Sequence, residues 1–288
     1  MMRHSDSSVI AAGGVNWAVH WRELVERRRV VIEGLATQGP QSDFWDQRAG
    51  RYARRVQSLD PKTDPLTQML LGLVRPGDTV LDVGAGTGRY AIPLAAVVSE
   101  VTAVEPAEAM RAQLEQALGV KRPKNVDVVA SNWEAAEVAP HDVVICSNVL
   151  YPIADAVSFI TKLDAHARRT VAIIIRVDQM AAMIDPMWHA IWGRGCPPEP
   201  GLLDLYNLVF ALGFRANVRL AHRANAQRFT DLDDALRQAH NQLFLPMEQT
   251  DHDERIRAYL AETLLPRDGE LESPFTPQYA LIWWEKDG

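Results

Sequence analysis

The sequence is poor in cysteine and has no long apolar run. Its 288 residues include only two cysteines, Cys146 and Cys196, which lie far apart and form no CxxC pair. A disulfide scaffold and a zinc ribbon are therefore excluded. No stretch reaches the roughly 18 apolar residues that a membrane-spanning helix needs, and the first residues contain no secretory hydrophobic segment. We expect a soluble, cytoplasmic protein without a membrane partner.

The sequence also lacks an excess of positive charge. Lys and Arg number 30 against 37 Asp and Glu, which gives a net charge of −7 at pH 7. Such a chain has little general affinity for nucleic acid or for an anionic membrane surface. Hydrophobic residues make up 47% of the chain, enough to bury a large core. These proportions are typical of a globular enzyme or binding protein.

The order of the predicted elements indicates an α/β fold. Helical spacing of apolar residues predicts a helix over about 15–37, a second after Ser42, and a third that starts at Asp64. Five apolar strands follow, separated by helices or loops, at 79–83, 101–105, 126–130, 142–146 and 171–177. This alternation predicts a doubly wound, mostly parallel Rossmann-like sheet with helices on both faces.

Beyond residue 177 the alternation loosens. A sixth strand near 214–220 and a last strand at 279–285 are separated by a predicted helical insertion. We expect segments of this region to form a cap over the site. The predicted units are an N-terminal helical extension, 1–40, and a main domain, 41–288, with cap segments near 179–212 and 230–275.

A glycine loop between the first strand and the next helix is the most informative motif. Glycines at such a turn let a ligand approach the backbone, and the free N–H groups of a helix start suit an anion. A dinucleotide fingerprint needs G-x-G-x-x-G, and its third glycine would fall at Arg89. Here Gly84, Gly86 and Gly88 are spaced G-x-G-x-G, and Asp82 stands two residues before the first of them.

This pattern resembles motif I of the class I S-adenosylmethionine-dependent methyltransferases, and the resemblance extends over about residues 41–178. It implies that S-adenosylmethionine is the cofactor and S-adenosylhomocysteine the product. Glu105 resembles the family's ribose-binding acid, and Asn132 stands where an adenine-contacting acid is usual. The implied cofactor-binding residues are Asp82, Gly84, Ala85, Gly86, Gly88, Glu105, Pro106, Asn132, Trp133, Ser147, Asn148 and Tyr52.

The chemistry of this cofactor fits these residues. Its carboxylate suits the loop amides, Asp82 could balance its ammonium, and Glu105 could accept both hydroxyls of the ribose. The adenine could lie against Trp133 or against apolar side chains. The alternative is a Rossmann-like fold that binds no nucleotide.

Methyl transfer from a sulfonium depends mainly on alignment, and a base is needed only for an acceptor that carries a proton. Ligands of open parallel sheets bind at the carboxyl ends of the strands, which makes His189, Tyr151 and Asp178 the candidate catalytic groups. Each has a structural alternative. Tyr151 and Asp178 could make ordinary hydrogen bonds, and His189 could be exposed on an amphipathic helix.

Aromatic residues predict where the acceptor binds. Trp188 and Trp192 flank His189, and Trp45 belongs to a segment that resembles the helix covering the cofactor in small-molecule methyltransferases. We expect the three tryptophans to contact the acceptor, although Trp188 and Trp192 at i, i+4 could equally pack into a core. No metal ligand set is predicted.

The segment after the fourth strand indicates the acceptor class. It reads Ser-Asn-Val-Leu-Tyr-Pro over 147–152, without the Asn/Asp-Pro-Pro-aromatic motif of enzymes that methylate nucleic-acid amines. A small-molecule acceptor is therefore favoured and nucleic acid is disfavoured. Two alternatives stay open: an enzyme that uses its Arg-rich N-terminal helices, with Arg27–Arg29 and the basic face of residues 48–55, to dock RNA or protein, and a non-catalytic cofactor-binding subunit. The sequence leaves the oligomeric state open, with a homodimer among the options.

Overall fold

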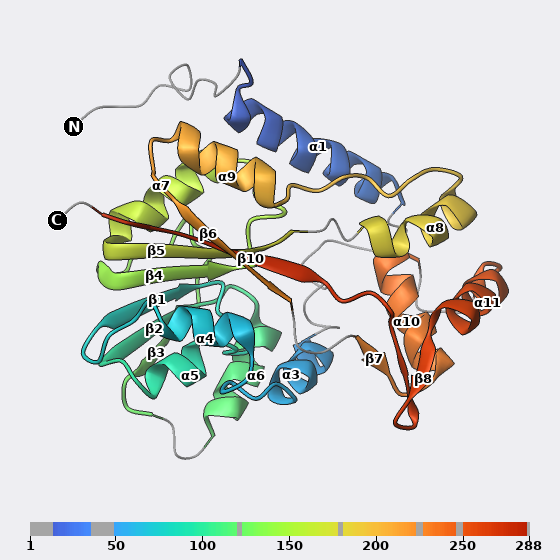
Figure 1. Ribbon diagram of the computed structural model, residues 1–288, viewed down its shortest axis with the longest axis horizontal. Coiled ribbons are helices and arrows are strands. Elements are labelled where there is room, and N and C mark those ends of the chain that lie inside the picture. The colour runs from blue at the N-terminus through green and yellow to red at the C-terminus, as the bar shows by residue number, and fades with distance from the viewer. Residues whose placement is uncertain are drawn as a thin grey trace.

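The computed structural model describes residues 14–35, 49–119, 123–177, 181–222, 227–245 and 250–286. Its centre is a seven-stranded sheet with the order β3-β2-β1-β4-β5-β10-β6 (Figure 1). The strands are β1 (Thr79–Val83), β2 (Glu100–Val104), β3 (Val126–Val129), β4 (His141–Ser147), β5 (Ala167–Arg176), β6 (Asn217–His222) and β10 (Gln278–Glu285). The first five pair in parallel, and β10 runs antiparallel between β5 and β6. The predicted fold class is confirmed.

Two helical layers cover the sheet. The helices are α1 (Trp17–Leu35), α3 (Ala49–Gln57), α4 (Pro65–Leu71), α5 (Ala91–Ala95), α6 (Glu108–Leu118), α7 (Ala156–His166), α8 (Ala181–Trp192), α9 (Leu202–Ala211), α10 (Leu232–Leu243) and α11 (Asp253–Thr263). Helices α4, α5 and α6 pack on one face, and α1, α7 and α9 on the other (Figure 1). The apolar run 171–175 of β5 is buried between both layers, as parallel strands require.

Helix α1 belongs to one of these layers. Trp21 is fully buried, and its indole Nε1 donates a hydrogen bond to the carbonyl oxygen of Ile153 at 2.8 Å. His20 of α1 pairs with Asp204 of α9 at 3.0 Å. The helix thus packs directly on the main domain, and the division at residue 40 stays a prediction.

A separate hydrophobic cluster lies beyond the sheet. It is formed by α8, α10, α11 and a small antiparallel sheet, β7 (Arg228–Phe229), β9 (Glu270–Glu272) and β8 (Leu265–Arg267). We call these elements the helical unit. Trp188, Leu243 and Ile256 fill its core. The helices were predicted, but the small strands were not, because two or three residues are too few to show an alternating pattern.

A buried ion pair fixes the start of α4 against the glycine loop. Asp64 caps the helix by accepting hydrogen bonds from the backbone N–H and the hydroxyl of Thr67, at 3.1 and 2.6 Å. Both of its carboxylate oxygens lie 3.1 Å from Nη2 of Arg89, and both side chains are almost fully buried. Burial alone would raise the pKa of Asp64, but the Arg89 charge and the Thr67 hydrogen bonds lower it.

We predict that Asp64→Ala lowers the free energy of unfolding by about 3–5 kcal/mol, because it leaves Arg89 buried without its carboxylate. Urea denaturation monitored by circular dichroism measures the loss. Glu23→Ala is the control, since Glu23 forms an exposed pair with Arg27 whose removal should cost less than about 1 kcal/mol. Equal effects of the two substitutions would contradict the role of the buried pair.

Candidate functional site

The glycine loop follows β1 at the carboxyl edge of the sheet. Gly84, Gly86 and Gly88 all have positive φ, at +75°, +57° and +84°. A Cβ at Gly84 would lie 2.2 Å from Cγ2 of Val149, and one at Gly88 would lie 2.4 Å from Cδ1 of Leu114. These two glycines allow the loop to pack tightly against its neighbours. Among the described residues, a Cβ at Gly86 would meet an atom of Tyr52 alone, at 3.8 Å, so there Gly86 leaves space beside the backbone.

Glu105 stands immediately after β2, next to this space. Its Oε2 accepts a hydrogen bond from the backbone N–H of Gly86 at 2.8 Å, and its Oε1 accepts one from that of Ala107 at 2.9 Å. Burial raises the pKa of Glu105, and these two amides oppose the rise. A carboxylate offers about four acceptor positions. Glu105 can therefore hold the loop in place and still accept two hydroxyl groups.

Asp82 lies beneath the loop and is almost completely buried. Its Oδ2 has no hydrogen-bond partner among the described residues, which is unusual for a buried carboxylate oxygen. Burial and the nearby negative charge of Glu105 raise the pKa of Asp82 to about 7. A cation placed at the loop would favour the ionised forms of both carboxylates. The pair therefore fits a ligand that carries positive charge.

The loop after β4 completes this edge. Asn148 has a φ of +58°, a conformation that asparagine tolerates better than most residues. Its Nδ2 donates to the hydroxyl of Ser147 at 3.1 Å, and its Oδ1 accepts from the hydroxyl of Tyr151 at 3.1 Å. The turn places Val149 against Gly84. Ser147 and Asn148 thus lie beside the glycine loop, and their contact with the cofactor stays a prediction.

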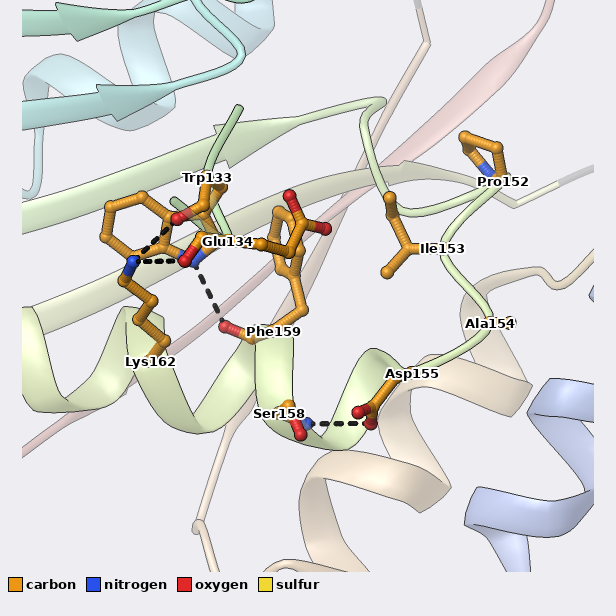
Figure 2. Close-up of a pocket in the computed structure, with 9 residues that line it drawn as sticks. All are labelled: Trp133, Glu134, Pro152, Ile153, Ala154, Asp155, Ser158, Phe159 and Lys162. Carbon is orange, nitrogen blue, oxygen red and sulfur yellow. Dashed lines mark hydrogen bonds between the residues drawn. The ribbon is translucent and has the colours of Figure 1, made fainter. Parts of the chain in front are cut away.

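The segment after β3 packs Trp133 against α7. The indole is buried, its Nε1 donates to the carbonyl oxygen of Phe159 at 3.3 Å, and Nζ of Lys162 lies 4.6 Å from the ring centroid (Figure 2). The ring is packed between α7 and its own loop, and a contact of the adenine with Trp133 or with apolar side chains stays a prediction. Asn132 precedes it, with Oδ1 accepting from the N–H of Ala135 at 3.0 Å.

A hollow of about 390 Å³ opens next to Trp133. Figure 2 shows Trp133 and Glu134 on one side and Pro152 and Ile153 on the other, with the start of α7 below. Nζ of Lys162 is directed at the loop, where it donates to the carbonyl oxygens of residues 133, 134 and 136 at 2.7–3.1 Å. The hollow is thus lined by the continuations of the loops after β3 and β4.

Tyr151 makes structural hydrogen bonds. Besides donating to Asn148, its hydroxyl oxygen accepts a hydrogen bond from the backbone N–H of Arg176 at 2.8 Å. The Arg176 guanidinium lies 4.3 Å from the centroid of the Tyr151 ring. Burial raises the pKa of Tyr151, so the phenol keeps its proton and acts as a donor. Two other predicted residues, Asp178 and Trp45, lie outside the described residues.

The packing of α8 corrects the predicted acceptor pocket. Trp188 is fully buried in the core of the helical unit, and Nε1 of Trp192 donates to the carbonyl oxygen of Leu243 at 3.1 Å. His189 is 60% exposed beside Asp185, 3.5 Å away on the preceding turn. Trp188 and Trp192 at i, i+4 therefore hold the helical unit together, and His189 stands outside any aromatic pocket formed by them.

Sequence reasoning missed the role of Glu199. This carboxylate is buried in the loop between α8 and α9, where it forms ion pairs with Arg176 of β5 and, at 3.5 Å, with Arg28 of α1. Arg28 also donates to the carbonyl oxygen of Pro197 at 2.6 Å. Glu199 therefore ties α1 and this loop to the carboxyl end of β5. No local sequence motif indicates this role of Glu199, because its partners are distant in sequence.

The arginine run 27–29 is neutralised by acidic neighbours. Arg27 pairs with Glu23 at 2.8 Å and Arg29 with Glu26 at 2.5 Å, while the middle arginine, Arg28, faces Glu199. In the described part of the chain, no group of three or more His, Cys, Asp or Glu side chains could hold a metal ion. Among the same residues, no helix is long and apolar enough to cross a membrane.

Comparisons with known proteins agree with this geometry. Residues 80–185 match a family model described as a methyltransferase domain. An uncharacterized protein of Haemophilus influenzae is 27% identical over 253 residues, which are 84% of this chain and 89% of the relative.

Two solved structures share the fold. The YcgJ protein of Bacillus subtilis superposes with a TM-score of 0.54 at 15% identity, covering 77% of this chain and 97% of its own. The Bacillus halodurans protein BH2331, whose own assignment as a methyltransferase is provisional, superposes with a TM-score of 0.53 at 14% identity. The match covers 76% of this chain and 97% of the BH2331 chain. Residues 80–185 thus match a methyltransferase domain model, and the two structures share the predicted Rossmann-like fold, which is confirmed.

We predict that Asp82→Asn stabilises the ligand-free protein as the pH rises. An unfolded aspartate ionises near pH 4, whereas the folded Asp82 stays protonated up to about pH 7. The wild-type protein therefore loses stability between these values, by up to about 4 kcal/mol at pH 8. Urea denaturation at pH 5 and pH 8 should show that the advantage of the variant grows with pH. Parallel pH profiles of the two proteins would contradict the raised pKa.

Proposed function

We propose that this protein is an S-adenosylmethionine-dependent methyltransferase that methylates a small-molecule acceptor. The observation that carries the proposal is the open backbone at Gly86, which lies between two buried carboxylates and beneath Tyr52. A sulfonium cofactor with a ribose diol, a carboxylate and an ammonium group matches each of these features. The methyltransferase domain over residues 80–185 supports the same activity.

The described residues fit this cofactor. Glu105 has free acceptor positions for the ribose hydroxyls, and the backbone amides of the loop 84–88 suit its carboxylate. Asp82 and Glu105 together favour its positive charge. Ser147 and Asn148 stand on the opposite side of the loop, where the methionine part would extend. When bound, S-adenosylmethionine supplies a methyl group on a positively charged sulfur, which is already a good leaving group.

The protein's own residues then act mainly by alignment. Tyr151 donates its one hydroxyl proton to Asn148 and accepts a hydrogen bond from the backbone of Arg176, so it fixes the turn after β4 against the end of β5. An acceptor whose nucleophilic atom carries a free lone pair needs no base. For an acceptor that must lose a proton, Asp178 is the residue we propose as base, since it follows β5 by two residues.

Two features support a small acceptor. The helical unit lies beyond the carboxyl ends of the strands, on the side where α8 follows β5 (Figure 1), so it covers part of the edge at which ligands of such sheets bind. The arginines 27–29, considered as a docking surface for RNA, are paired with acidic groups. A non-catalytic cofactor-binding subunit differs from this proposal by binding without turnover.

We predict that Glu105→Ala weakens S-adenosylhomocysteine binding by about 1.5–3 kcal/mol, or roughly 10- to 150-fold, because it removes the acceptor of the ribose hydroxyls. Isothermal titration calorimetry measures the affinity. Glu108→Ala is the matched control, since Glu108 is an exposed carboxylate in the first turn of α6 and should leave affinity unchanged. NADH should show no saturable binding. Unchanged affinity in a folded Glu105→Ala protein would remove Glu105 from the site.

The activity itself can be tested by measuring S-adenosylhomocysteine release. Pooled small molecules that bear amine, hydroxyl, thiol or carboxyl groups should give turnover above background, whereas total tRNA and denatured protein should not. Turnover only with RNA or protein would overturn the small-molecule assignment. Tight cofactor binding without turnover on any of the three classes would favour the non-catalytic subunit.

A further inference from the structure

Helix α3 covers the open point of the glycine loop. The Cε1 atom of Tyr52 is the nearest atom to a Cβ built at Gly86, at 3.8 Å. The Tyr52 phenol also lies close enough to Arg89 and Tyr90, at the end of the loop, to influence the pKa of each. Any ligand that lies along Gly86 therefore has α3 as its neighbour.

The described side chains of α3 bury little apolar surface that would hold the helix in this place. The helix has nine residues, and its fully buried side chains are two alanines, Ala49 and Ala53. Three arginines and Gly50 make up much of the remainder. A helix this short is marginal on its own and depends on tertiary contacts for its position. Helix α3 packs against α6, and polar contacts to other elements can add to what holds it in place.

Such contacts come from the helical unit. Nη2 of Arg51 lies 2.8 Å from Oδ1 of Asp234, and its Nη1 donates to Oε1 of Gln238 at 2.9 Å. Asp234 and Gln238 are one turn apart on α10, so they present both acceptors on the same side of the helix. Asp234 is itself held by the backbone N–H of Thr230 at 3.3 Å. The guanidinium of Arg51 thus binds two side chains of α10, one of which is itself held in place.

We propose that Arg51 is a positioning residue that fastens α3 over the cofactor site. Through Arg51, the helical unit controls how tightly the cofactor is held and how fast the product leaves. This inference rests on the proposed function. The side chain of Arg51 is 37% exposed and that of Asp234 20%, and pairs of this kind are weak enough to break and re-form during turnover. We call the contacts of Arg51 with Asp234 and Gln238 the clamp. It joins segments that are more than 180 residues apart in sequence.

The test combines three variants with one matched control. Arg51→Gln and Asp234→Asn each break the ion pair, and Arg51→Asp combined with Asp234→Arg restores it with reversed charges. Asp233→Asn is the control, because this neighbouring carboxylate on α10 pairs with Arg257 of α11 and not with α3. Thermal unfolding verifies that each variant is folded.

Stopped-flow measurement of S-adenosylhomocysteine dissociation is the first readout. Arg51→Gln and Asp234→Asn should raise the dissociation rate roughly 5- to 20-fold, as expected for loss of one charged hydrogen-bonded contact. The control should stay within about twofold of the wild type, and the charge-reversed pair should recover most of the loss. Equal rates in all variants, or no recovery in the reversed pair, would overturn the proposal.

Hydrogen exchange of the α3 amides is the second readout, and it does not depend on the cofactor. Exchange should accelerate in Arg51→Gln and Asp234→Asn and stay unchanged in Asp233→Asn. If the wild-type protein bound no S-adenosylhomocysteine, the proposed function would fail, and exchange would still decide whether Arg51 fastens α3. Unchanged exchange in Arg51→Gln would overturn the clamp even in a protein that binds the cofactor.

Discussion

The burial of two neighbouring carboxylates shapes the proposed site. Asp82, the last residue but one of β1, lies under the glycine loop with one oxygen unpartnered among the described residues, and Glu105 follows the neighbouring strand β2. Burial raises the pKa of Asp82 to about 7, and the negative charge of Glu105 adds to this rise. A packed core would avoid this arrangement, since a buried unpaired charge lowers stability. Sites that sacrifice stability in this way are usually sites of function.

The sheet brings the two acids together. Strands β1 and β2 pair in parallel with Asp82 opposite Ala103 and Val83 opposite Val104, so both chains leave the sheet at the same edge. Glu105 then reaches across to the backbone of Gly86. Gly84 and Gly88 let the loop pack against Val149 and Leu114, which leaves Gly86 as the open position. The loop, the acids and the space for a ligand therefore depend on one parallel register.

Local sequence patterns predicted the strands and the glycine loop at the carboxyl edge of the sheet, but few of the contacts that the surrounding helices make. Strands such as 79–83 and 171–175 are short apolar runs bounded by turn residues, and the glycine spacing excluded a dinucleotide fingerprint at Arg89. Trp188 and Trp192 show the limit of such patterns. Their i, i+4 spacing predicts one shared face, but the partner of that face, α10, comes some 40 residues later.

Contacts between segments that are distant in sequence could not be predicted, for the same reason. The partners of Glu199 come from α1 and β5. Arg51 contacts residues of α10 that lie more than 180 positions later in the sequence. The ring of Trp133, a predicted adenine contact, packs against Phe159 and Lys162 of a later helix. Residue type and spacing identify groups that can bind a ligand, whereas tertiary packing decides which of them remain accessible.

The central claim is that Asp82 and Glu105 select a positively charged ligand. Calorimetric titrations at pH 7 in two buffers of different ionisation enthalpy count the protons released on binding. S-adenosylmethionine carries one more positive charge than S-adenosylhomocysteine. It should therefore release more protons, because Asp82, partly protonated at this pH, ionises as the sulfonium binds. Asp82→Asn should abolish the difference. Equal proton release by the two ligands in the wild-type protein would contradict the account.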